Sequence, residues 1–272
     1  MATKLGMQAR GMFGKMHDKA SQTRENHMDR AEQIGDYMQS RGLREIGDMK
    51  LKHVNGFMQE KMEDNLSTGT LSNYASTLRQ MAEKMGKGDM IPSKNQEAFG
   101  FCRTEAEKMN PQVADREKIN QVTEKLREMK DGEWRALAYE MQGAFGLRRK
   151  ESALSVELKD GKLQVKGAKG GKPRELEATT AAQKDVYGRV KAYIADHKQK
   201  SLVPSNLTLK QGVNRLSSSV NRAGGTKANC ANPHINRHAF AQDMKSEGKS
   251  GREISNTLGH NRDQSGHYVP ED

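Results

Sequence analysis

Four segments in the second half of the chain carry side chains that could form a site for a phosphate group. The first reads FGLRRKE from Phe145 to Glu151, so a glycine ends an apolar helix and Arg148 follows directly. Glu151 lies three residues after Arg148, a spacing that puts both side chains on one helical face. The carboxylate can then hold the guanidinium while the other guanidinium donors stay free for a ligand. The same spacing occurs in ordinary surface salt bridges, so the pair needs support from the other segments.

The second segment is a basic hairpin tip, KGAKGGKPR, over residues 166–174. Glycines let a backbone approach a ligand closely, and Lys169 stands among them, so the tip could contact a phosphate. A flexible charged loop is the alternative interpretation of this composition.

The third segment follows Pro233, a residue favoured at helix starts, and reads HINRHAFA from His234. His234 and Arg237 are three residues apart, so both can converge on one anion near the helix N-terminus, where the dipole favours negative charge. His234 and His238 also have the i, i+4 spacing of a metal-binding pair. No glutamate stands between them and no third ligand is suitably spaced, so a metal site is not expected.

The fourth segment, LGHNRDQSGHY, runs from Leu258 to Tyr268. Gly259 is expected to end a helix and to present His260 from the turn, and Tyr268 follows after a polar loop. A single tyrosine near the end of a chain is ordinarily a surface or packing residue.

The apolar pattern around these segments predicts a mostly helical domain with a small antiparallel sheet. Apolar residues at three- and four-residue steps predict helices near 119–129, 134–145, 180–197, 207–222, 234–247 and 250–258. Alternating apolar residues predict strands at 154–158, 163–165 and 174–176, with Gly161 in the first turn. The reactive side chains would therefore come from helix ends and from one hairpin.

The first half of the chain predicts a separate helical domain. Four short amphipathic helices are expected within residues 23–110. Residues 1–22 are basic with weak periodicity and predict a mobile arm. The polar stretch 111–118 predicts a linker, and residues 119–272 form the second domain. The expected fold class is mainly α, with the sheet confined to the second domain.

The charge distribution predicts a nucleic-acid partner. Residues 1–120 hold 19 Lys and Arg against 17 Asp and Glu, whereas residues 121–272 hold 27 against 18. No acidic residue occurs between Asp196 and Asp243, and a stretch with one sign of charge attracts polyanions. A solvated basic surface or a ribosome-type tail is the alternative, but apolar residues at helical spacing favour a folded nucleic-acid-binding domain. Charge alone does not distinguish DNA from RNA.

Membrane, secreted and zinc-binding classes are disfavoured. No window approaches the roughly 18 apolar residues of a membrane span, and the N-terminus lacks the apolar core of a signal peptide. A cytoplasmic protein is therefore expected. Cys102 and Cys230 have no metal-ligand spacing, so we expect both to be reduced and structural.

In their order along the chain, the four segments resemble the signature of the tyrosine recombinase (phage integrase) family. That signature is GLRxxE, a lysine in a basic hairpin, HxxRH, and LGH followed by a late tyrosine. The helical first domain also resembles the family's SAM-like core-binding domain, including its helix at Thr70 to Tyr74. The spacing from His260 to Tyr268 is one residue shorter than the family's commoner spacing. The C-terminal helix that many members donate to a neighbouring subunit is expected to be absent.

The resemblance implies a site-specific DNA recombinase that cleaves and rejoins DNA through a 3′-phosphotyrosyl intermediate. It assigns the nucleophile to Tyr268 and the general acid for the leaving 5′ oxygen to Lys169. It assigns Arg148 and Arg237 as the arginines that clamp the phosphate. His234 and His260 would orient the phosphate or accept the tyrosine proton. Glu151 and His238 would be supporting residues. No cofactor, metal or nucleotide, is implied.

The partner that the resemblance implies is double-stranded DNA. It also implies a homo-tetramer on two DNA sites, with a monomer allowed without DNA, and a bacterial or phage-encoded protein associated with the nucleoid. The basic residues expected to contact DNA are Lys166, Lys172, Arg174, Lys210, Arg215, Arg222 and Lys227.

Two other functions fit the same residues. One is a catalytically weak DNA-binding or architectural protein that keeps the fold and the basic surface. The other is a nicking-closing enzyme like the type IB topoisomerases, which shares the chemistry but needs no partner site.

Overall fold

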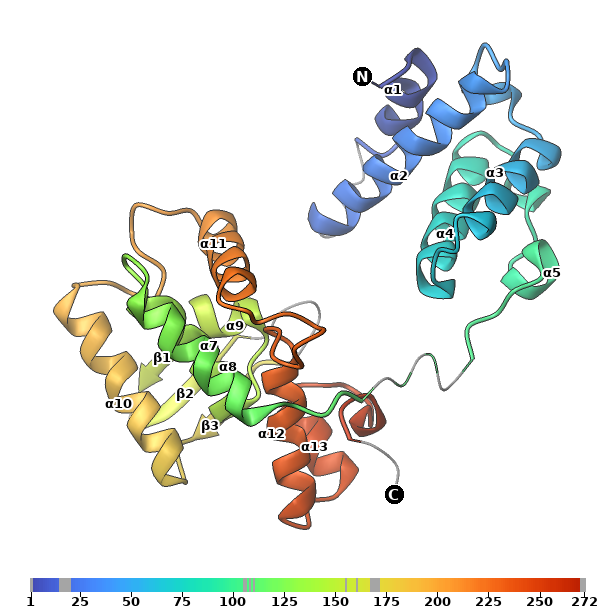
Figure 1. Cartoon of the computed structure of the whole chain (residues 1–272). Helices are drawn as coiled ribbons and strands as arrows, with labels where there is room; N and C mark the ends of the chain where they lie inside the picture. Colours follow the sequence, from blue (N-terminus) through green and yellow to red (C-terminus); the bar gives the residue numbers. More distant parts are fainter. Residues whose placement is uncertain are drawn as a thin grey trace. The chain divides into compact units, whose positions relative to one another are not determined.

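The computed structural model describes residues 2–14, 21–104, 107, 109, 111–154, 156–159, 161–166 and 172–269. The chain divides into two compact units, Met1–Glu107 and Lys108–Asp272. Figure 1 shows helices throughout both units and strands in the second. No helix in the described part of the chain has both the length and the apolar character needed to cross a membrane.

The first unit is a helical bundle. Its elements are the helices α1 (Lys4–Gly11), α2 (Ser21–Ser40), α3 (Leu51–Glu63), α4 (Thr68–Lys84) and α5 (Asn95–Phe99) and the short 3₁₀ helices η1 (Ile46–Asp48) and η2 (Gly88–Met90). The core is built largely from Met and aliphatic side chains, among them Ile34, Met38, Met58, Leu78 and Met81, which are fully buried. Methionine fills irregular gaps between helices, so a chain with few aromatic residues can still close such a core.

Helix α1 corrects the expectation of a mobile basic arm over residues 1–22. Leu5, Ala9 and Phe13 recur every four residues and are buried, which makes the described part of this segment a core element. Helix α1 packs against α2, where a Cβ on Gly35 would lie only 2.4 Å from the carbonyl oxygen of Leu5. The absence of a side chain at Gly35 allows this close approach, which the charge pattern did not reveal.

The second unit is built around helix α8 (Glu133–Phe145), which contacts five neighbouring helices. Its Trp134, Leu137, Met141 and Phe145 are almost completely buried. A helix that is apolar on several faces is a core helix, and its neighbours cover it. The other helices of the unit are α7 (Arg116–Glu128), α9 (Arg149–Leu154), α10 (Ala181–Asp196), α11 (Leu209–Arg222), α12 (Ile235–Ser246) and α13 (Gly251–Thr257), with a 3₁₀ helix η3 (Ser265–His267) near the C-terminus.

The sheet of this unit has three antiparallel strands in the order β1 (Val156–Lys159), β2 (Lys162–Val165) and β3 (Arg174–Glu177). Leu163 pairs with Leu176 and Val165 with Arg174, and the side chains of Leu163 and Val165 join the core. The predicted fold class, mainly α with a small antiparallel sheet in the second domain, is confirmed.

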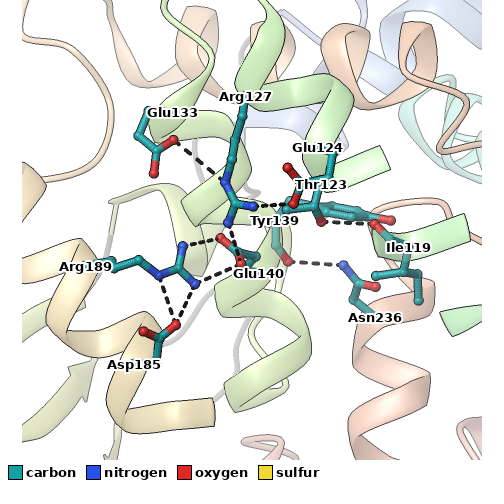
Figure 2. A network of polar contacts seen from close by, with 10 residues as sticks. All are labelled: Ile119, Thr123, Glu124, Arg127, Glu133, Tyr139, Glu140, Asp185, Arg189 and Asn236. Carbon is teal, nitrogen blue, oxygen red and sulfur yellow. Dashed lines mark hydrogen bonds and ion pairs between the residues drawn. The ribbon is translucent and has the colours of Figure 1, made fainter. Parts of the chain in front are cut away.

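An ion-pair network fastens α7, α8 and α10 to one another (Figure 2). Arg127 of α7 and Arg189 of α10 both donate to the carboxylate of Glu140 on α8, at 2.9 Å. Arg189 also reaches Asp185 one turn before it. The hydrogen bond to Glu140 is the largest cause that raises the pKa of Arg189 above its ordinary value. The ion-paired residues Arg127, Glu140, Asp185 and Arg189 lie outside the four reactive segments.

Candidate active site

Arg237, on the first turn of α12, is the centre of the candidate site. Its side chain is fully buried, and Nη2 donates to the carbonyl oxygen of Leu258 at 2.7 Å. Nη1 donates to the carbonyl oxygen of Gly146, and Nε lies 3.2 Å from the hydroxyl of Tyr268. Burial lowers the pKa of Arg237 to about 10, so the guanidinium stays charged at neutral pH. One cation therefore joins three of the four reactive segments.

Tyr268 follows η3 directly and turns its side chain into the unit, with 6% of the residue exposed. Its ring lies under the guanidinium of Arg237, with 5.2 Å between the guanidinium carbon and the ring centroid. The hydroxyl also lies 2.9 Å from Nε2 of His260. Gln242 donates to the backbone carbonyl of Tyr268 at 3.0 Å, which fixes the turn that carries the ring.

The neighbours of His260 determine which of its ring nitrogens carries the proton. Nε2 lies 3.1 Å from Nη2 of Arg237, and a guanidinium can only donate, so Nε2 must offer its lone pair. Burial, followed by the positive charges of Arg237 and Arg148, lowers the pKa of His260 to about 4. The ring is therefore neutral at neutral pH. Its Nε2 can accept a hydrogen bond from the hydroxyl of Tyr268.

A buried carboxylate holds Arg148. Glu151 is completely buried and accepts from Arg148 twice at 2.9 Å, from the backbone N–H and from Nη1. Arg174, the first residue of β3, donates to the same carboxylate from Nη2 at 3.0 Å. Burial alone would raise the pKa of Glu151, but the hydrogen bond and charge of Arg174, with those of Arg148, hold it below its usual value. Two guanidiniums around one carboxylate leave one positive charge in excess.

The glycines of two motifs have structural roles at this site. Gly146 has a φ of +60°, and a Cβ there would lie 2.5 Å from the ring of Phe240. Gly259 has a φ of +75°, and a Cβ there would lie 2.6 Å from Nη1 of Arg174. Left-handed backbone and close approach both exclude larger residues. The turns that bring Arg148 and His260 to the site therefore depend on glycine.

His238 and His234 also lie beside the ring of Tyr268. His238 is 4% exposed, its ring centroid lies 5.0 Å from that of Tyr268, and its Nδ1 accepts from the backbone N–H of Gln112 at 3.3 Å. Burial lowers the pKa of His238 to about 4. The ring of His234 lies 5.0 Å from that of His238 in an edge-on arrangement, and His234 itself is exposed. The accessible imidazole is thus that of His234.

The structure brings most of the predicted catalytic residues together. Arg237, His260 and Tyr268 are in direct contact, His234 and His238 line the tyrosine ring, and Arg148 is close enough for its charge to act on Arg237 and His260. The sequence did not indicate Gln112 or Gln242, because their contacts join residues 26 to 130 positions apart. The predicted Lys169 lies outside the described residues.

The expected DNA-contacting residues differ in exposure. The side chain of Arg174 is only 8% exposed and binds the carboxylate of Glu151. The other residues of that set are exposed: Lys166, Lys172, Lys210, Arg215, Arg222 and Lys227. Among the described residues, no three His, Cys, Asp or Glu side chains form a group that could hold a metal ion.

The fold and the site together define an integrase-type protein, and comparison with family models agrees. Residues 102–243 match the model described as integrase, and residues 3–91 match the model described as phage integrase, N-terminal. The first match spans more than half of the chain and includes Arg148, Glu151 and Arg237. The chain therefore belongs to the phage integrase family, the tyrosine-type site-specific recombinases. Comparison with curated proteins finds no significant match.

Several solved structures share the fold at low sequence identity. A lambda integrase fragment bound to DNA superposes with a TM-score of 0.68 at 14% identity, over 98% of this chain and 96% of that chain. The XerH site-specific recombinase bound to a palindromic difH substrate gives 0.67 at 15%, over 97% and 80%. The Tn1549 transposon integrase in complex with transposon right-end DNA gives 0.62 at 15%, over 97% and 95%. At such identities the likeness concerns the fold.

Proposed function

We propose that this recombinase cleaves and rejoins double-stranded DNA through a 3′-phosphotyrosyl intermediate formed on Tyr268. The observation that carries the proposal is the position of the Tyr268 hydroxyl, 2.9 Å from a neutral imidazole nitrogen of His260 and 3.2 Å from Nε of Arg237. A nucleophile with an adjacent base and a fixed cation is the arrangement that covalent catalysis on a phosphate requires.

The attack would begin with transfer of the tyrosine proton to Nε2 of His260. The phenolate oxygen of Tyr268 then forms a bond to phosphorus, and the bond from phosphorus to the 5′ oxygen breaks. The departing 5′ oxygen takes a proton from a general acid, which we assign to Lys169 on the hairpin. The new ester conserves the energy of the broken one, so the reverse reaction with a 5′ hydroxyl rejoins a strand.

Charge develops on the nonbridging oxygens of the phosphate during this reaction. Arg237 and Arg148 would stabilise it, because a guanidinium keeps its charge and presents a planar set of donors. Glu151 orients Arg148 by accepting a hydrogen bond from its guanidinium. His234, which is exposed beside Tyr268, would orient the phosphate. No step calls for a cofactor.

Double-stranded DNA is the substrate that the chemistry and the fold favour. Structures of lambda integrase and of the Tn1549 transposon integrase with this fold were solved on DNA, and the exposed basic residues of the second unit would supply phosphate contacts. A lambda integrase tetramer bound to a Holliday junction gives a TM-score of 0.66 over 96% of this chain and 74% of that chain. We therefore propose a tetramer on two DNA sites, with a monomer in the absence of DNA. Light scattering of the protein with and without its duplex tests the assembly.

The test of the proposed reaction uses a nicked suicide duplex. The site is first located by footprinting on DNA that flanks the encoding gene, and a nick is then placed beside the scissile phosphate so that the leaving strand diffuses away. We expect a covalent protein–DNA adduct from the wild type and none from Tyr268→Phe, with equal DNA binding by both. An adduct that forms as well with Tyr268→Phe would refute the assignment of the nucleophile. DNA binding by the wild type without any covalent adduct would instead support the alternative of a catalytically weak, architectural DNA-binding protein.

A further inference from the structure

We propose that Arg174 is a positioning residue that holds two parts of the site, Arg148 through Glu151 and the turn of His260 through Gly259. The inference rests on the proposed function, since it concerns how Arg148 and His260 are kept in place for the reaction. The sequence alone predicts a different role, because an arginine at the base of a basic hairpin is expected to contact DNA.

Both oxygens of the Glu151 carboxylate are shared between the two arginines. Oε2 accepts from the backbone N–H of Arg148 at 2.9 Å and from Nη2 of Arg174 at 3.0 Å. Oε1 accepts from Nη1 of Arg148 at 2.9 Å and from Nη1 of Arg174 at 3.4 Å. The carboxylate is thus fixed from the sheet side by Arg174, and it fixes Arg148 on its other side. Without Arg174, a completely buried carboxylate would depend on Arg148 alone.

A carboxylate paired with Arg148 alone would cancel the charge that the phosphate is meant to meet. Because Arg174 neutralises Glu151 as well, Arg148 keeps its attraction for an anion while remaining oriented. The side chain of Arg148 is 20% exposed and that of Arg174 is 8% exposed, so Arg148 is the one that a ligand can reach.

Arg174 also supports the turn that delivers His260. Gly259 lies against the guanidinium of Arg174, where a Cβ would come within 2.6 Å of Nη1, and its carbonyl accepts from the backbone N–H of Lys172 at 3.3 Å. The start of β3 therefore supports the residue just before His260. His260 in turn contacts both Arg237 and Tyr268. A displacement of Arg174 would therefore move the turn of His260 and change the contacts of the Tyr268 hydroxyl.

The chain offers a matched control in the network of Figure 2. Arg189 also donates through both Nη groups to a half-buried carboxylate, that of Glu140, at 2.9 Å. None of the contacts of Arg189 involves a residue of the candidate site. Arg174→Gln and Arg189→Gln therefore remove comparable ion pairs, one beside the site and one away from it.

The experiment compares Arg174→Gln, Arg174→Lys and Arg189→Gln by single-turnover cleavage of the suicide duplex, DNA binding and urea unfolding. We expect Arg174→Gln to slow cleavage by about 10- to 10²-fold with little change in binding, as is typical when a group that orients a reactive residue is lost. Arg174→Lys should recover part of that loss, because it keeps the charge and one donor. Arg189→Gln should lower stability and leave cleavage within about twofold, since its contacts lie away from the site.

A double-variant cycle asks whether part of the effect of Arg174 passes through Arg148. In an Arg148→Lys background, Arg174→Gln should slow cleavage by a clearly smaller factor than in the wild type, because one of the two parts that it positions is already lost and only the turn of His260 remains. Fully multiplicative effects, or wild-type cleavage by Arg174→Gln, would overturn the proposal. If Arg174→Gln does not fold, the same comparison is made with Arg174→Lys.

A readout without cleavage separates this inference from the proposed function. The Nε–H NMR signal of Arg148, assigned by its loss in Arg148→Lys, reports the mobility of that side chain in the free protein. We expect faster motion and faster hydrogen exchange at Arg148 in Arg174→Gln than in the wild type or in Arg189→Gln. An unchanged signal would overturn the positioning role even if the enzyme cleaves DNA, and a changed signal would support it even if the chain forms no adduct.

Discussion

Nε2 of His260 lies 2.9 Å from the hydroxyl of Tyr268 and 3.1 Å from Nη2 of Arg237. Because the guanidinium can only donate, the imidazole lone pair faces both groups, and the tyrosine proton has an acceptor already in place. The pKa of His260, lowered to about 4 by burial and neighbouring cations, keeps that acceptor unprotonated at neutral pH. The contact thus links the charge of the site to the reactivity of its nucleophile.

The first prediction concerns this contact. His260→Gln keeps a hydrogen-bonding side chain of similar size but cannot take up a proton. We expect single-turnover cleavage to fall by about 10²- to 10⁴-fold, the usual contribution of a general base, with little change in DNA binding. His197→Gln is the control, because His197 is exposed and stacks on Tyr193 away from the site. Equal cleavage by the two variants would contradict the role of His260.

The second prediction concerns Arg237. Lysine keeps the charge at this position but cannot reproduce the planar set of donors that reaches Gly146, Leu258 and Tyr268. We expect Arg237→Lys to lower the cleavage rate by about 10²- to 10³-fold. DNA binding should change little, because many exposed Lys and Arg residues contribute contacts to the phosphates of the DNA backbone. Wild-type cleavage by Arg237→Lys, measured beside Arg189→Lys, would indicate a merely electrostatic role.

The third prediction uses two glycines with the same backbone conformation. Gly259 and Gly248 have φ of +75° and +81°, but a Cβ meets Arg174 only at Gly259, whereas no atom lies within 4 Å of a Cβ on Gly248. Both alanine variants should lose about 1–3 kcal/mol of unfolding free energy from backbone strain. Gly259→Ala should also slow cleavage at a temperature where the protein stays folded. Equal cleavage by both variants would show that the contact with Arg174 is unimportant.

The fourth prediction concerns stability and pH. His238 has a folded-state pKa of about 4 against an ordinary value of 6.5. Between these two values, His238 is therefore protonated in the unfolded chain and mostly neutral in the folded chain. Stability from this group is therefore complete above pH 6.5 and is lost as the pH falls toward 4, by about 2 kcal/mol at pH 5. His238→Gln should show a smaller loss of unfolding free energy between pH 7.5 and 5 than the wild type. Urea unfolding at the two pH values measures it, and an identical loss in both proteins would contradict the buried neutral state.

The fold could be predicted where burial leaves a periodic signal. Helix α8 carries apolar residues at Trp134, Leu137, Met141 and Phe145, and its observed bounds differ from the predicted ones by one residue. The first helix was missed although Leu5, Ala9 and Phe13 recur every four residues, because Gly6, Gly11 and Gly14 interrupt the pattern. Those glycines weaken a helix in isolation, and the packing of α1 on α2 outweighs that local cost.

The site could be predicted as a set of residue types but not as a set of contacts. Arg148, Arg237, His260 and Tyr268 stand in short motifs whose spacing is visible along the chain. The contact of Arg174 with Glu151 could not be predicted, because the charge of Arg174 is visible in the sequence and its burial is not. Its partner Glu151 lies 23 residues earlier and meets it only when β3 pairs with β2. Long-range contacts of this kind depend on the tertiary fold, so a single sequence gives no signal for them.

The most direct test of the account is to locate the bond between protein and DNA. The covalent adduct from the suicide duplex is digested with nuclease and trypsin, and the peptide that retains a nucleotide 3′-phosphate is sequenced by tandem mass spectrometry. We expect the modification on Tyr268, with a mass that corresponds to a phosphodiester and with no other modified residue. A 3′-phosphate bond to a different side chain, or a 5′-phosphate linkage, would contradict the proposed mechanism.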